Sequence, residues 1–202
     1  PRIQANPRTT DPAGTRTAAV GGARVTLLLP QSKKPEPVVR TTQASPTLFW
    51  RQVGAADRQV VLAVRPDDGP GQLLRVSRLV KKNDRQVRAV DLAACGAVLE
   101  LGRVYEVVLE IVEDPDNRDK NPHVRGWIKR VEARDELSSA LREAGPVGHA
   151  AVYAERGLWL DALGSVWWTK RLQPKEPYWS GAWAELIGVA DLVKGDRTAS
   201  DK

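Results

Sequence analysis

The hydrophobic periodicity of this chain of 202 residues changes once, near Glu132. Before that point, short apolar runs are separated by Pro, Gly, Asn and Asp, a pattern typical of strands joined by turns. After it, apolar residues recur at the spacing of amphipathic helices. A series of strands followed by a series of helices indicates an α+β fold.

The first part of the chain contains seven predicted strands, at residues 25–29, 47–53, 59–64, 73–80, 87–90, 103–112 and 123–131. The last is the clearest, because Val124, Gly126 and Ile128 fall on one side of the strand and Trp127 falls on the other. Short strands with turns between them favour antiparallel pairing. We therefore expect an antiparallel immunoglobulin-like β-sandwich.

The second part predicts a small C-terminal helical appendage. A helix over residues 136–144, with Asp135 as its N-cap, ends at Gly145-Pro146. Further helices are expected over residues 147–155, 158–172 and 179–190. In the last of these, one stripe is formed by Trp183, Leu186 and Ile187.

Within the appendage, four residues have the mutual spacing of a helix-turn-helix repeat of about 34 residues: Tyr153, Gly157, Ala162 and Pro174. Gly157 can adopt the left-handed conformation that ends a helix, and Ala162 is small enough for two helices to lie close together. Pro174 ends the second helix because it lacks an N–H group. The pattern resembles a tetratricopeptide hairpin, a unit that usually presents a surface to another protein.

Composition divides the chain into four parts. Residues 1–23 are rich in Thr, Pro, Ala, Gly and Arg, which predicts an extended or disordered tail. The sandwich is expected over residues 24–132, the appendage over residues 133–192 and a polar tail over residues 193–202.

Charge and composition narrow the classes of partner. The net charge is +6, but basic residues are interleaved with acidic ones and no nucleic-acid-binding motif is present, so we expect no nucleic-acid partner. No apolar run approaches the roughly 20 residues of a membrane-spanning helix. The single cysteine, Cys95, follows two alanines and is expected to be buried. A chain that begins at Pro1 and not at Met is consistent with a removed leader.

The sequence offers no set of residues suited to catalysis or to cofactor binding. The only histidines are His123 and His149, and no Gly-x-Ser-x-Gly motif is present. We therefore expect no catalytic residues, no cofactor and no metal.

One acidic connection is a candidate calcium site, because oxygen ligands at such density could hold calcium. Its residues are Asp114, Asp116, Asn117, Asp119 and Asn121. Arg118 stands where a further ligand is needed, and neither a glycine nor a bidentate Glu is in place. The preferred interpretation is a polar hairpin turn.

The chain has 7 Trp residues, most of which are expected in the core. Trp167 and Trp168 are about 100° apart around a helix, so one of them is expected to be exposed. The candidate partner-binding residues are Trp159, Trp167, Trp168 and Trp179. Asp161 is expected to pair with a basic residue such as Arg125 or Arg130.

Several short strings recur in the order found in a known family. They are Ser-Pro-Thr-Leu-Phe-Trp at residues 45–50, Leu-Gly-Arg-Val-Tyr at 101–105, Asp-Pro-Asp-Asn-Arg at 114–118, Val-Arg-Gly-Trp-Ile-Lys-Arg at 124–130, Tyr-Ala-Glu-Arg-Gly-Leu-Trp-Leu-Asp-Ala-Leu at 153–163 and Trp-Ala-Glu-Leu at 183–186. With these strings, roughly residues 44–192 resemble a bacterial family, best represented in cyanobacteria, called domain of unknown function nine-two-eight. The resemblance implies a secreted or envelope location and supplies no activity. Members often carry cysteines that this chain lacks, for example near Val112, so no disulfide is inferred.

Together these observations favour docking over catalysis. We expect a non-enzymatic accessory or scaffold subunit of a bacterial envelope assembly. It would lie in the periplasm or elsewhere outside the cytoplasm, peripheral to the membrane, and bind protein partners through its tail and helical face. The alternative is a carbohydrate-binding sandwich whose exposed Trp side chains stack on sugar rings. A flat row of Trp on one sheet face would favour sugar, whereas a patch on the helices would favour protein.

Overall fold

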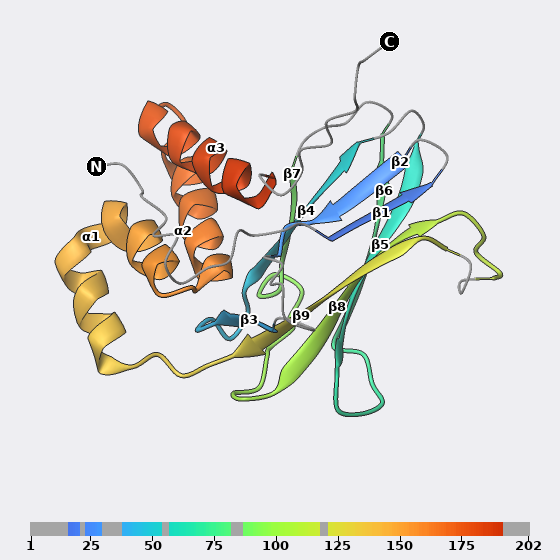
Figure 1. Cartoon of the computed structure of the whole chain (residues 1–202), viewed down its shortest axis with the longest axis horizontal. Helices are drawn as coiled ribbons and strands as arrows, with labels where there is room; N and C mark the ends of the chain where they lie inside the picture. The colour runs from blue at the N-terminus through green and yellow to red at the C-terminus, as the bar shows by residue number, and fades with distance from the viewer. Residues whose placement is uncertain are drawn as a thin grey trace, which may run out of the picture.

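The computed structural model describes residues 16–20, 23–29, 38–53, 57–81, 87–117 and 121–191. These residues form nine strands in two sheets, followed by three helices (Figure 1). Strands first and helices last is the α+β arrangement that the change of periodicity predicts.

The four-stranded sheet has the order β1-β2-β4-β7, and every neighbouring pair is antiparallel. Its strands are β1 (Arg16–Val20), β2 (Ala23–Leu27), β4 (Thr47–Val53) and β7 (Val87–Asp91). β1 lies within the predicted tail, whose residues 1–15 are outside the described residues.

The five-stranded sheet has the order β3-β9-β8-β5-β6. Its strands are β3 (Val38–Thr41), β9 (His123–Arg130), β8 (Val104–Val112), β5 (Arg58–Pro66) and β6 (Leu74–Val80). β3 was not predicted, and it departs from the antiparallel expectation because it runs parallel to β9. β3 has only four residues, and it lies at the edge of the five-stranded sheet, whereas the preceding strand, β2, belongs to the four-stranded sheet. No hairpin therefore connects β3 to its neighbour and fixes its direction.

The two sheets pack against each other across a hydrophobic core, and Gly126 of β9 lies close to leucine side chains at the end of β2. A Cβ atom added at Gly126 would lie 2.6 Å from Leu29 Cδ1 and 3.3 Å from Leu27 Cδ2. Val124 and Ile128, on the same side of β9, are buried. The predicted inward face of this strand is therefore confirmed, and its glycine gives room to the leucines of the opposite sheet.

The helices are α1 (Asp135–Glu155), α2 (Trp159–Leu172) and α3 (Pro177–Asp191). α1 is bent at Gly145, where a break was predicted. Asp135 is not the N-cap: Arg134 occupies that position without a side-chain hydrogen bond, and Asp135 begins the first turn, where its charge complements the helix dipole. Gly157 has a φ of +69° between α1 and α2, as its role in ending a helix requires. No helix among the described residues is long and apolar enough to cross a membrane.

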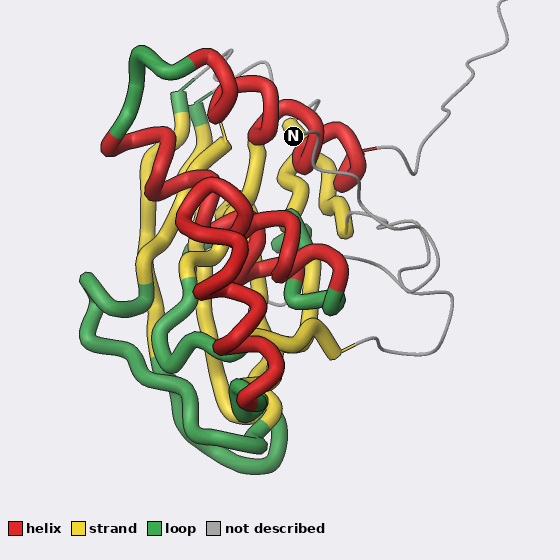
Figure 2. The backbone as a smooth tube through the Cα atoms, turned by 90° about the vertical axis from the view of Figure 1, so that its left-hand side faces the viewer, coloured by secondary structure: helices red, strands yellow, loops and turns green. Residues whose placement is uncertain are grey.

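The helices lie to the left of the strands in Figure 1, and Figure 2 shows them from that side. An aromatic cluster joins them to the four-stranded sheet. The Phe49 ring of β4 lies 5.7 Å from the Trp167 ring of α2 and 5.5 Å from the Trp183 ring of α3. The contact is between elements far apart in sequence, and it fixes the appendage on the sandwich.

Cys95 is exposed, so the expectation that it is buried was wrong. It lies in the turn that follows β7, where the buried positions are taken by Leu92 and Ala97. An apolar local sequence did not determine burial because the turn directs only some of its residues inward.

Candidate functional site

A groove lies where the helices meet the sandwich, and we call it the junction groove. Its volume is about 390 Å³. The sandwich contributes Gln43, Ser45, Pro46, Thr47, Asp91 and Ala93, and the helices contribute His149, Tyr153, Leu160, Asp161, Gly164, Ser165 and Trp168. Clefts between packed units are common places for ligands, which makes this groove the first candidate site.

Asp161 of α2 is buried at the base of this junction, with 4% of its surface exposed. Its Oδ1 accepts a hydrogen bond of 2.7 Å from Thr41 Oγ1, and its Oδ2 accepts one of 2.9 Å from the Thr42 backbone N–H. Burial raises the pKa of the Asp161 carboxyl, although these hydrogen bonds act in the opposite direction. Asp161 thus joins α2 to the end of β3 through both of its oxygens.

The predicted pairing of Asp161 with Arg125 or Arg130 was wrong. Arg125 forms an ion pair with Glu106 at 3.4 Å, and Arg130 donates a hydrogen bond to the Leu99 carbonyl oxygen at 3.1 Å. The real partners are Thr41, the last residue of β3, and Thr42, which follows it; the sequence pattern did not reveal this strand.

Two further titratable side chains line the groove from α1. Tyr153 is half-buried, and its pKa is raised first by burial and then by the negative charge of Asp161, while a hydrogen bond with Gln43 lowers it. His149 Nε2 donates a hydrogen bond of 3.0 Å to the Leu141 carbonyl oxygen across the bend at Gly145. Both contacts stabilise the local structure, so these groups have a structural role in the groove.

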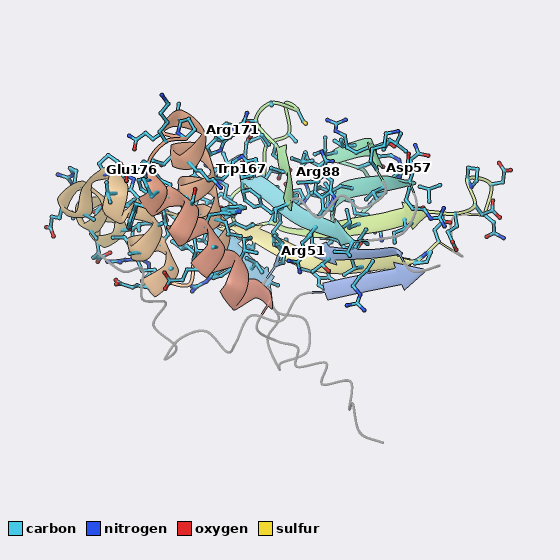
Figure 3. The ribbon with its side chains drawn as sticks, turned by 90° about the horizontal axis from the view of Figure 1, so that it is seen from above. Arg51, Asp57, Arg88, Trp167, Arg171 and Glu176 are labelled. Carbon is cyan, nitrogen blue, oxygen red and sulfur yellow. The ribbon has the colours of Figure 1, made fainter. Side chains whose placement is uncertain are left out.

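The four candidate Trp residues differ in accessibility. Trp159 and Trp179 are buried, and Trp179 Nε1 donates to Gln173 Oε1 at 2.9 Å. Trp167 is half-buried in the aromatic cluster, at the junction of helices and sheet in Figure 3. Trp168 remains 44% exposed, as expected for one member of the Trp167–Trp168 pair. Of the four, Trp168 therefore offers the most surface to a partner.

Trp168 belongs to an exposed patch near the end of α2, and we call Trp168, Arg171 and Leu172 the α2 patch. Leu172, four residues after Trp168 and thus on the same helix face, is 81% exposed. The Arg171 guanidinium lies 5.6 Å from the Trp167 ring centre and 6.0 Å from that of Trp168 (Figure 3 labels Arg171 and Trp167). Trp168 also lines the junction groove, where its Nε1 donates to Thr47 Oγ1 at 3.3 Å. Groove and patch therefore form one continuous surface.

The acidic connection between β8 and β9 has the hydrogen bonds of a turn. Asn121 Oδ1 accepts from the backbone N–H groups of Glu113 and Asp114, at 3.0 Å and 2.9 Å. Asp114 Oδ1 accepts from those of Asp116 and Asn117, at 2.9 Å and 3.0 Å. Within the described part of the chain, no group of three or more His, Cys, Asp or Glu could hold a metal ion. Asp119 lies outside the described residues.

Comparison with known proteins gives the family. The model of the family described as Domain of Unknown Function (DUF928) matches residues 11–199. The chain belongs to this family. None of the curated proteins matches it. Two of the strings that carry the resemblance, at residues 45–50 and 153–163, contribute Ser45, Pro46, Thr47, Tyr153 and Asp161 to the junction groove.

The sequence did not predict the groove itself. Its two walls are more than 40 residues apart in the chain, and the threonines that hold Asp161 lie at the end of an unpredicted strand. The one available signal was the crowding of Tyr153, Trp159 and Asp161 around Gly157. This crowding indicated that the segment contacts either the sandwich or a partner.

Proposed function

We propose that this protein is a non-enzymatic accessory or scaffold subunit of a bacterial envelope assembly, and that it binds a protein partner through its helical face and its N-terminal tail. The α2 patch is the observation that carries the proposal. Trp168 and Leu172 are exposed side by side, with Arg171 beside them. Trp and Arg are the residues most enriched where binding energy concentrates in protein interfaces.

The placement of Trp residues favours a protein partner over a sugar. Of the 7 Trp residues, all of which are described, Trp127 alone lies on the outer face of the five-stranded sheet. A sugar-binding platform needs several aromatic rings spread along one face of a sheet. Here the exposed ring of Trp168 lies on a helix, beside the exposed Leu172. The carbohydrate-binding alternative is therefore the weaker candidate.

Finer features of the fold belong to the same proposal. An immunoglobulin-like sandwich is consistent with the two facing sheets, and a tetratricopeptide-like hairpin is consistent with the positive φ of Gly157 and the buried Ala162. A location outside the cytoplasm rests on the family resemblance and is tested by cell fractionation.

Co-purification from native envelope tests the function. We expect the wild-type chain to bring down a defined partner at fixed stoichiometry, and the double variant Trp168→Ala/Leu172→Ala to lose it. Leu101→Ala is the matched control, because Leu101 is also an exposed leucine but lies on the sandwich. Recovery of the wild-type chain alone, with a monomeric mass in solution, would contradict the proposal.

A further inference from the structure

The junction groove has a charge opposite to that of the whole chain. The chain carries a net charge of +6. Among the described residues that line the groove, Asp91 and Asp161 are acidic, His149 is the one imidazole, and neither Lys nor Arg is present. A negative groove on a positive molecule selects for a cationic ligand group.

Both carboxylates are held in fixed positions. Both oxygens of Asp161 already accept hydrogen bonds from Thr41 and Thr42. Asp161 therefore acts on a ligand through its negative charge and not through a direct contact. Asp91, at the end of β7, is half-buried, and its Oδ1 accepts a hydrogen bond of 3.1 Å from the Ala93 N–H. A carboxylate has about four acceptor sites, so Asp91 retains acceptor capacity for a ligand.

Two aromatic side chains complete the groove, Tyr153 from α1 and Trp168 from α2. Aromatic ring faces attract cations within about 6 Å. The Trp168 ring already shows this attraction, because the Arg171 guanidinium lies 6.0 Å from its centre. Arg171 does not line the groove, so it leaves the interior to a second cation.

We propose that the junction groove receives an Arg or Lys side chain of the protein partner, while a neighbouring apolar residue of that partner rests on the α2 patch. The inference depends on the proposed function and adds the chemistry of the partner to it. Trp168 belongs to both surfaces, so a cationic residue next to an apolar one in the partner can occupy both at once. A free small amine would use the groove and leave the patch uncovered.

A matched pair of peptides tests the charge requirement on the full chain. The probe is acetyl-Gly-Leu-Arg-Leu-Gly-amide, and its control replaces Arg with citrulline, which has nearly the same shape without the charge. Binding is followed by the indole N–H resonance of Trp168 in NMR spectra, assigned with Trp168→Phe. We expect the Arg peptide to shift this resonance and to bind at least about threefold more tightly than the citrulline peptide.

Two variants separate the groove from general electrostatics. Asp91→Asn keeps an acceptor for the Ala93 N–H and removes the charge, so it is expected to abolish the preference for Arg over citrulline. Glu143→Gln, an exposed acid on α1, removes the same charge elsewhere and is expected to leave the preference intact. Unchanged melting temperatures show that both variants fold.

Equal binding of the two peptides, an unaffected Trp168 resonance, or equal loss of the preference in Asp91→Asn and Glu143→Gln would overturn the inference. Guanidinium ion binding as tightly as the peptide would also overturn it, in favour of a small-cation site. If Trp168→Ala/Leu172→Ala loses the native partner but Asp91→Asn retains it at full affinity, the docking function stands and the cation site fails.

Discussion

The two sheets of the sandwich have very different outer faces. On the four-stranded sheet, Trp50 faces the other sheet and its neighbour Phe49 faces the opposite way. Phe49 packs there against Trp167 and Trp183 of the helices. On the five-stranded sheet, the corresponding outward positions of neighbouring strands hold Glu106, Arg65 and Arg125, with Glu106 paired to both arginines. The described helices lie to one side of β5 and β8 and not over them (Figure 1).

The same alternating strand pattern thus gives two different kinds of outer face. Alternation directs every second side chain outward in both sheets, and the chemistry of those side chains determines what covers the face. Aromatic side chains recruit the helices to one sheet. On the other sheet, the ion pairs of Glu106, together with Trp127, form a polar outer face that water can solvate.

Removing Phe49 should give the largest effect. Phe49→Ala removes the aromatic contacts between β4 and the helices, and we expect it to lower the free energy of unfolding by about 3–5 kcal/mol. Trp127→Ala, on the open face, should cost only about 1 kcal/mol. Urea denaturation followed by circular dichroism measures both, and equal losses would show that the two faces are covered to the same degree.

Removing Asp161 should come next. Asp161→Ala leaves the Thr41 hydroxyl and the Thr42 N–H without their acceptor in a buried place, so we expect a loss of about 2–4 kcal/mol. Asp161→Asn keeps an acceptor and should stay within about 1 kcal/mol of wild type, since burial of the charge already opposes ionisation. An Asn variant as unstable as the Ala variant would show that the charge itself holds the junction together.

Adding one methyl group at Gly126 should have a smaller effect. Gly126→Ala forces Leu29 to move because the new Cβ would lie 2.6 Å from its Cδ1, and we expect a loss of about 1–3 kcal/mol. The matched control is Gly181→Ala in α3, where a Cβ meets nothing within 4 Å and should stabilise the helix by about 0.5–1 kcal/mol. Thermal unfolding of both variants gives the comparison, and no loss at Gly126 would mean that the sheets have room to spare.

The smallest expected effect is a pH dependence. Burial raises the pKa of Asp161 in the folded protein above its ordinary value of 3.8. The stability that this shift contributes is therefore fully present below pH 3.8 and is lost as pH rises through the folded pKa. The free energy of unfolding of wild type minus that of Asp161→Asn should therefore become more positive as pH falls from 7 towards 4. A constant or opposite difference in urea titrations would show that the hydrogen bonds outweigh burial.

The sequence predicted the parts of this fold that have a strong local pattern. Seven strands, the bend at Gly145, the helix end at Gly157 and the inward face around Gly126 all follow from periodicity or from glycine chemistry. β3 was missed because its four residues are too few to show an alternation, and its pairing with β9 joins residues about 90 positions apart.

The candidate site was less predictable for the same reason. Helix geometry predicts that one member of the Trp167–Trp168 pair is exposed. Which member is exposed depends on Phe49 of β4, because Trp167 packs against it. The partners of Asp161 lie at the end of β3, which the sequence did not predict, so the expected pairing with an arginine was wrong. Tertiary packing, and not local pattern, decides these contacts.

Site-specific photo-crosslinking in native cells tests the docking claim most directly. A photoreactive amino acid replaces Trp168 or Leu172 of the α2 patch in turn. The reference positions are two other exposed residues, Arg142 of α1 and Leu101 of the sandwich. We predict one adduct of defined mass from positions 168 and 172 and none from positions 142 and 101. Adducts of equal yield at all four positions, or none at the α2 patch in a fully folded chain, would contradict the account.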